Sequence, residues 1–158
     1  MKIRDLLLAG AVCASVCSVG ASRPAAAGEL DHLAGNWQGR GTVDRSDGTR
    51  ENLRCQASYA SAGSVSMSLK CASDSYNFEL RSSIKNDSGK LSGTWSELTR
   101  RLEGSLSGKI DGDTMRATVN SDRFSAFMNV RTVGGNQAVT IESPGSTIAK
   151  VSISLRKS

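Results

Sequence analysis

Apolar and polar residues alternate along most of the chain after residue 35, in short runs separated by turn-forming residues. In the run from Val65 to Cys71, apolar residues occupy every second position, and Ser or Lys fills each position between them. A period of two residues is typical of β-strands that bury one face. The pattern predicts ten strands, near residues 36–44, 51–60, 65–72, 76–85, 90–97, 101–110, 114–120, 123–133, 137–142 and 147–156.

Short sequences rich in glycine, aspartate and asparagine separate these runs. They are Ser46–Gly48, Asn86–Gly89, Asp111–Asp113, Gly134–Asn136 and Pro144–Gly145. Such residues accept the positive φ that tight hairpin turns require. A helical period occurs only over residues 29–33, for about one turn. No linker or change of composition divides the chain, so we expect a single domain over residues 28–158.

Consecutive hairpins form an antiparallel up-and-down meander, here of eight to ten strands, whose one apolar face has to be covered. Closing the sheet into a barrel covers that face and removes both exposed edges. We therefore predict an all-β barrel. The side chains expected inside it are apolar and stand at alternate positions: Leu69, Phe78, Leu80, Leu106, Val119, Val130, Ile141 and Ile153.

Several inward positions carry very small residues, namely Gly93, Gly104, Gly108, Ala117 and Ala126. Small residues either leave room for a ligand inside or permit tight bends at barrel corners. An outer-membrane barrel shows the same alternation, but it needs an apolar outer band bordered by aromatic girdles. The seven aromatic residues of this chain are too few and too scattered for such girdles, which favours a barrel in water.

Cys55 and Cys71 stand symmetrically about Gly63, and no other cysteine follows residue 27. If the segment around Gly63 is the tip of a hairpin, the two cysteines face each other, with Cβ atoms roughly 4.5–5.5 Å apart. That separation suits a disulfide bond. We expect a Cys55–Cys71 disulfide, which implies an oxidising compartment.

The first 27 residues are organised like a cleaved signal peptide. Lys2 and Arg4 precede an apolar stretch (6–20) of about 15 residues, and the small residues at 25–27 suit cleavage before Gly28. The stretch is short for a membrane span, although an uncleaved anchor is the alternative. We predict a periplasmic or secreted protein with no integral membrane segment after cleavage.

The charge of the chain is only mildly basic. It has 20 basic and 15 acidic residues, a net charge of +5, and without residues 1–27 the counts are 17 and 14, a net charge of +3. The basic residues are scattered, mostly at positions expected to face outward. This is typical of a solvated surface rather than of a patch for nucleic acid or anionic lipid. With few aromatic residues for stacking, we do not expect nucleic acid as a partner.

Residue groupings that carry catalysis or bind metals are mostly absent from the sequence. His32 is the only histidine, it adjoins Asp31, and no Gly-x-Ser-x-Gly sequence accompanies it. One histidine and a cysteine pair expected to be oxidised do not make a zinc site. Glu97 and Glu103 stand at positions expected to face outward beside Arg100, which suggests surface ion pairs rather than paired catalytic carboxylates. We expect no enzyme, no metal and no cofactor.

The first expected strand opens with Gly35-Asn36-Trp37, a Gly-x-Trp sequence that follows the possible helical turn. This segment resembles the opening motif of lipocalins and the wider calycin group. In that group the tryptophan closes the floor of the barrel and packs under a basic residue from the last strand. The resemblance implies that Trp37 closes one end of a barrel here and that Arg156 packs across its ring.

Two classes of function remain open. The first is a carrier that holds a small apolar or amphipathic ligand inside the barrel, against inward side chains at Met67, Tyr76, Phe78, Met115 and Met128. The second is a module of the cell envelope that binds another protein. Small calycin-like protease inhibitors are one example, and residues 28–33 would then block the protease. A cavity of several hundred Å³ inside the barrel would favour the carrier, and a filled core would favour the interaction module.

Overall fold

A computed structural model describes residues 30–158, and the expected signal peptide therefore lies outside the described residues. A short 3-10 helix, η1 (Asp31–Leu33), precedes ten strands. These are β1 (Gly35–Arg45), β2 (Arg50–Ser61), β3 (Val65–Ala72), β4 (Asn77–Asp87), β5 (Lys90–Glu97), β6 (Leu102–Asp111), β7 (Thr114–Asn120), β8 (Ser125–Val133), β9 (Asn136–Glu142) and β10 (Ile148–Lys157). Within the described part of the chain, no helix is long and apolar enough to cross a membrane.

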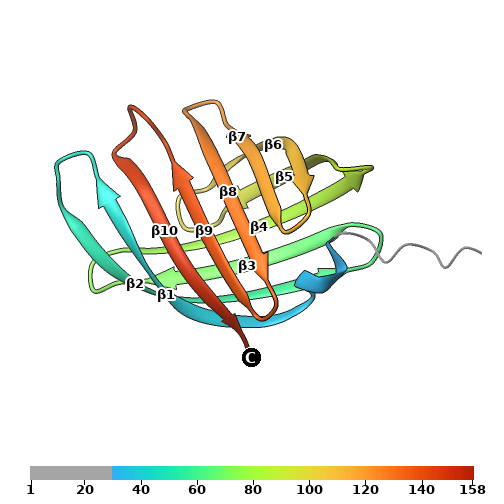
Figure 1. The fold of residues 1–158 in the computed structure, drawn as a ribbon. Coiled ribbons are helices and arrows are strands. Elements are labelled where there is room, and N and C mark those ends of the chain that lie inside the picture. The colour runs from blue at the N-terminus through green and yellow to red at the C-terminus, as the bar shows by residue number, and fades with distance from the viewer. Residues whose placement is uncertain (1–29) are drawn as a thin grey trace, which may run out of the picture.

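The ten strands form one closed antiparallel barrel (Figure 1). Each strand pairs with its neighbours in the sequence, and β1 closes the ring by pairing with β10 from Trp37↔Lys157 to Arg45↔Ile148. This confirms the predicted meander and its closure. The short turns decide the topology, because a two- to five-residue connection can only join antiparallel neighbours.

The barrel has two different ends. One end carries η1 and the loops that follow β2, β4, β6 and β8, and we call it the closed end. The other end carries the five loops 46–49, 73–76, 98–101, 121–124 and 143–147, and we call it the mouth. In Figure 1 the blue η1 and the end of the red β10 lie at the same side of the barrel.

The core lies inside the barrel, as the alternation predicts. All eight residues expected inside are on the inner face; Leu69, Phe78, Leu106, Val130 and Ile153 are buried, and Leu80, Val119 and Ile141 are half-buried against the core. The largest fully buried side chains are Trp37, Leu53, Leu155 and Val43. The outer face of the strands carries mostly Ser, Thr, Asn, Gln and charged residues.

The inward glycines allow the strands to bend and do not leave space for a ligand. A Cβ atom placed on Gly104 would lie 1.8 Å from the backbone oxygen of Asn120 on β7. On Gly93 and Gly108 it would lie 2.2 and 2.1 Å from backbone oxygens of neighbouring strands. The backbone itself fills the space that a side chain would take, so of the two explanations the tight corner applies.

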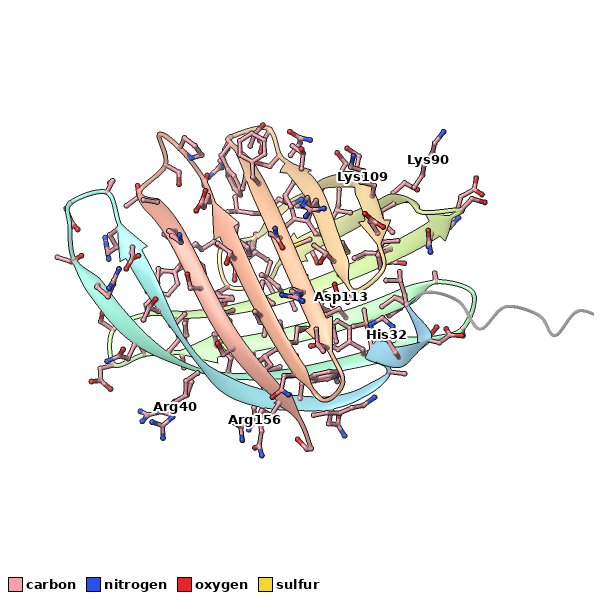
Figure 2. The ribbon with its side chains drawn as sticks, viewed as in Figure 1. His32, Arg40, Lys90, Lys109, Asp113 and Arg156 are labelled. Carbon is pink, nitrogen blue, oxygen red and sulfur yellow. A yellow bond between two sulfur atoms is a disulfide. The ribbon has the colours of Figure 1, made fainter. Side chains whose placement is uncertain are left out.

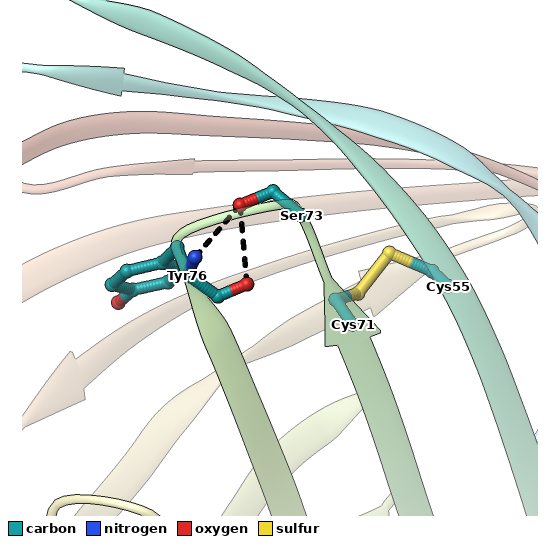
Figure 3. The surroundings of a disulfide bond; sticks show 4 residues. All are labelled: Cys55, Cys71, Ser73 and Tyr76. Carbon is teal, nitrogen blue, oxygen red and sulfur yellow. Dashed lines mark hydrogen bonds between the residues drawn. A yellow bond between two sulfur atoms is a disulfide. The ribbon is translucent and has the colours of Figure 1, made fainter.

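The predicted disulfide is confirmed (Figure 3). Cys55 on β2 lies directly opposite Cys71 on β3, with Cα atoms 4.2 Å apart. Gly63, with φ +78°, forms the tip of their hairpin. The bond closes a loop with a sequence separation of 16 residues. Closing a loop of this length stabilises a fold by about 3 kcal/mol in the chain-entropy account.

Candidate ligand-binding site

The closed end of the barrel is sealed by apolar side chains. Leu30 and Leu33, next to and within η1, are 5% and 4% exposed, and Trp37 is 1% exposed. The indole Nε1 of Trp37 donates a hydrogen bond to the backbone oxygen of Leu33 at 2.8 Å. The edge of its ring meets Tyr59, with centroids 6.2 Å apart. Trp37 therefore closes this end, as the lipocalin resemblance implies.

The basic residue beside Trp37 is Lys157, and the expectation for Arg156 is wrong. Lys157 is the register partner of Trp37, and its Nζ lies 5.5 Å from the ring centroid and donates a hydrogen bond to the oxygen of His32 at 3.1 Å. Arg156 pairs with Gln38 and points away from the barrel (Figure 2). Successive residues of a strand face opposite sides, so one step along β10 moves a side chain from floor to outer surface.

A polar chain of three residues lies inside the closed end. The hydroxyl of Tyr59 donates to Oε1 of Gln137 at 2.8 Å, and Nε2 of Gln137 donates to Oγ1 of Thr132 at 3.0 Å. Burial raises the pKa of Tyr59 to about 12, and the hydrogen bond to Gln137 opposes part of this rise. Each of these three side chains has a hydrogen-bond partner, as buried polar groups require. This cluster is structural.

The mouth differs from the closed end, because its apolar side chains are only half-buried. Most of the partly buried apolar residues that pack on the core are inward-facing and belong to the mouth half of the barrel. They are Tyr76, Leu80, Leu102, Val119, Phe124, Met128, Ile141 and Ile148, and we call them the mouth ring. The buried Trp95 supports the ring from below, with its centroid 5.8 Å from that of Phe124. Water therefore reaches apolar surface at this end.

The five predicted ligand residues divide between the two ends. Tyr76 and Met128 belong to the mouth ring, and Phe78 lies just below it, buried and with its centroid 6.0 Å from that of Tyr76. Met67 and Met115 are inward-facing but stand near the closed end, on the first residues of β3 and β7. The structure thus brings Tyr76 and Phe78 together, and it places Met128 in the same half of the barrel on β8.

Tyr76 is held in place by polar neighbours at the edge of the mouth (Figure 3). Its backbone N–H donates to the hydroxyl of Ser73 at 2.9 Å, beside the disulfide. The guanidinium of Arg100 lies 4.2 Å from its ring centroid, a cation–π distance. Burial raises the pKa of the Tyr76 hydroxyl, while the charge of Arg100 opposes the rise. Tyr76 is therefore a neutral donor at pH 7.

Glu97 faces inward, which corrects the expectation that it lies on the surface. Its side chain is buried, 7% exposed, and accepts hydrogen bonds from the backbone N–H groups of Glu79, Thr99 and Arg100 at 3.2, 3.0 and 2.7 Å. The predicted ion pair with Arg100 is present at 3.7 Å. Glu103 is exposed on the outer face as expected. No sequence motif indicates that this loop turns its N–H groups toward a carboxylate.

Two charged residues, Arg45 and Glu51, lie on the β1–β2 side of the mouth. Arg45 occupies the inward side of β1, and its Nε is buried without a hydrogen bond, at 3.9 Å from Asp47. Glu51 accepts hydrogen bonds from the hydroxyls of Ser73 and Ser75, which lower its pKa. The charge of Arg45 also acts on Glu51 and on Tyr76. A buried N–H group that makes no hydrogen bond among the described residues therefore stands at the edge of the mouth.

Three clefts of about 470–720 Å³ lie on the outer face of the barrel, not inside it. Their linings consist mainly of outward residues, such as Arg40 and Gln56 for the first, Lys109 and Thr118 for the second, and Ser66 for the third. None of these three clefts is the interior cavity that would favour a carrier. Among residues 30–158, no group of three or more His, Cys, Asp or Glu is placed to hold a metal ion.

The ten-strand antiparallel barrel fits a calycin- or lipocalin-like fold. No protein-family model and no curated protein matches the sequence. The solved structure of Rv2717c from M. tuberculosis is similar, with a TM-score of 0.65 and 10% identity over 84% of this chain and 98% of that chain. The S-type phycobiliprotein lyase CPES from Guillardia theta has a TM-score of 0.56 and 12% identity over 82% of this chain and 90% of that chain. At these identities the similarity concerns the fold alone.

Proposed function

We propose that this protein binds a small amphipathic molecule at the mouth of the barrel and catalyses no reaction on it. The observation that carries the proposal is the difference between the two ends. The closed end is sealed by Trp37, whereas the mouth ring, at the other opening of the barrel, leaves apolar side chains half-exposed. Concave apolar surface with a few polar groups is where small molecules bind.

The polar groups around the mouth determine how a bound ligand is oriented. Phe124, Met128 and Ile141 offer apolar contact on one side. Arg45 and the hydroxyl of Tyr76 offer hydrogen-bond donors on the other, and the Nε of Arg45 has no hydrogen-bond acceptor among residues 30–158. A molecule with an apolar body and an anionic or carbonyl head group satisfies both sides. In this proposal the ligand sits in the opening of the barrel, half-exposed to water.

Two further observations support this proposal over a protease inhibitor. Leu30 and Leu33 are buried in the closed end, which leaves the described part of the N-terminal segment unsuited to enter another protein. One protein of similar fold is, by its name, a phycobiliprotein lyase. Barrels of this fold therefore include a protein that acts on another molecule. We also propose export from the cytoplasm, for which the disulfide and the expected signal peptide are the support.

Binding of 1-anilinonaphthalene-8-sulfonate, an amphipathic anion, tests the proposal through two matched variants. Met128→Ala shortens a half-buried inward methionine at the mouth, and Met67→Ala shortens a half-buried inward methionine near the closed end. We expect saturable binding that Met128→Ala weakens about tenfold, since the contact of about two methylene groups is lost. Met67→Ala should leave the affinity unchanged. Equal loss in both variants, or no saturable binding to the folded protein, would contradict the proposal.

The role of Arg45 has its own control. Arg45→Gln should weaken binding of the anionic probe, because the guanidinium carries a positive charge at the mouth and its Nε makes no hydrogen bond among the described residues. Binding of N-phenyl-1-naphthylamine, which is uncharged but similar in shape, should change little. An equal loss for both probes would mean that Arg45 acts on the shape of the mouth and not on a ligand's charge.

A further inference from the structure

Three basic side chains stand in one row on the outer face, on the opposite side of the barrel from Arg156. Lys90 on β5 lies directly opposite Lys109 on β6, and Lys109 lies directly opposite Arg116 on β7. Residues opposed in this way have Cβ atoms roughly 4.5–5.5 Å apart. Figure 2 shows Lys90 and Lys109 projecting from the barrel, far from Arg40 and Arg156. We call Lys90, Lys109 and Arg116 the basic row.

No carboxylate neutralises the basic row. None of its members takes part in an ion pair found among residues 30–158. The acidic residues nearby are Asp87, which is the register partner of Lys90, and Asp111, which stands two positions after Lys109 on β6. Glu142 lines the same cleft and is already paired with Lys150 at 3.0 Å. Like charges directly opposite each other destabilise a sheet. The row therefore carries a cost in stability that an anionic partner would relieve.

The basic row lines the largest of the three outer clefts. This cleft has a volume of about 720 Å³ and crosses β5 to β9. Its remaining lining includes the hydroxyls of Ser107, Thr118 and Thr140 and the amide of Asn129. Phe127 stands at the same surface with 61% of its side chain exposed, the most exposed large hydrophobic residue of the described chain.

We propose that this cleft binds an acidic polysaccharide. The basic row offers three cations at the spacing of neighbouring strands, about 4.8 Å, to successive carboxylate, sulfate or phosphate groups. The hydroxyl and amide side chains beside it exchange hydrogen bonds with sugar hydroxyls. The exposed ring of Phe127 offers an apolar surface on which the face of a sugar ring can stack.

The same observations disfavour an anionic membrane as the partner. Membrane adsorption through basic residues is strengthened by a group of apolar side chains that enter the bilayer together. The exposed large hydrophobic residues among residues 30–158 are Leu98, Phe127 and Val133. Leu98 lies in a mouth loop and Val133 at the closed end of β8, so Phe127 stands alone beside the basic row.

Isothermal titration of the purified protein with heparin, a sulfated polysaccharide, tests the proposal. The variant Lys90→Gln/Lys109→Gln/Arg116→Gln removes the basic row. The matched control Arg40→Gln/Arg54→Gln/Arg156→Gln removes three exposed charges from β1, β2 and β10. We expect the row variant to weaken heparin binding at least about tenfold and to flatten its salt dependence, and the control to weaken it less than about threefold.

A second variant separates sugar recognition from charge. Phe127→Ser keeps every charge and should weaken heparin binding by about threefold at 0.3 M salt, where charge contributes less. Neutral dextran, titrated in the same way, serves as the control polymer that has sugar rings but no charge. Equal loss in the row variant and its control would overturn the proposal, because binding would then follow net charge alone. Absence of heparin binding, or binding to phosphatidylglycerol vesicles with none to heparin, would overturn it as well.

Discussion

At the scale of single residues, the alternation of apolar and polar positions decides which side chains enter the barrel. Phe78 and Glu79 face opposite ways as expected, and so do Leu106 and Ser107. Glu97 and Arg45 also face inward, each two positions after a buried residue, Trp95 and Val43, so the alternation itself points them into the barrel. The pattern along the strand does not contain the loop N–H groups that hold the Glu97 carboxylate there.

The inward glycines make a testable case of close packing. Gly104→Ala should destabilise the fold by about 2–3 kcal/mol, because its new Cβ would meet the backbone oxygen of Asn120 at 1.8 Å and neither strand can move freely. Urea unfolding measures the change. Gly135→Ala is the control, since a Cβ there meets only the Lys157 side chain at 3.8 Å, and it should stay within about 0.5 kcal/mol of the parent. Similar costs at both positions would refute the corner explanation.

The raised pKa of Tyr59 predicts that the fold loses stability at high pH. Burial raises its pKa from 10.0 to about 12, so the folded state holds the phenol proton more tightly than the unfolded chain does. The resulting stabilisation is complete below pH 10 and disappears as the pH rises from 10 to 12. It amounts to at most about 3 kcal/mol. The measurement is unfolding free energy against pH for the parent and Tyr59→Phe. Parallel curves for the two proteins across this window would show that Tyr59 has no such role.

At the scale of elements, each of the ten strands was predictable because turn residues mark its ends and period-two alternation fills it. The disulfide followed from the same information, since a hairpin centred on Gly63 fixes the register of Cys55 and Cys71. The basic partner of Trp37 was missed by one residue. Register across β1 and β10 depends on how the barrel closes, and that closure is a property of two segments at opposite ends of the chain.

Lys157 and Arg156 therefore form a matched pair for mutation. Lys157→Ala removes the cation above Trp37 and the hydrogen bond to the oxygen of His32, and it should cost about 1 kcal/mol of unfolding free energy. Arg156→Ala removes an exposed side chain on the outer face and should cost less than about 0.5 kcal/mol. Thermal unfolding of both variants checks this. A larger effect from Arg156→Ala would restore the original expectation.

At the scale of the whole molecule, closure brings together residues that the sequence keeps far apart. The mouth ring takes members from residue 76 to residue 148, and the basic row joins residues 90, 109 and 116. Along the sequence these basic residues look scattered, which explains why a solvated surface was the expected interpretation. The difference between a sealed end and an open end was equally hidden, because it depends on which loops η1 covers.

The central claim is that ligand binds at the mouth and not in the closed half of the barrel. Beyond Met1 the chain has methionines only at 67, 115 and 128, one near the mouth and two nearer the closed end, all facing inward. Protein labelled with methyl-¹³C methionine therefore reports on both ends in one NMR spectrum during titration with dodecanoate. The account predicts a saturable shift of the Met128 methyl signal while the Met67 and Met115 signals keep their positions. A shift of Met67 or Met115 with Met128 unchanged would contradict it.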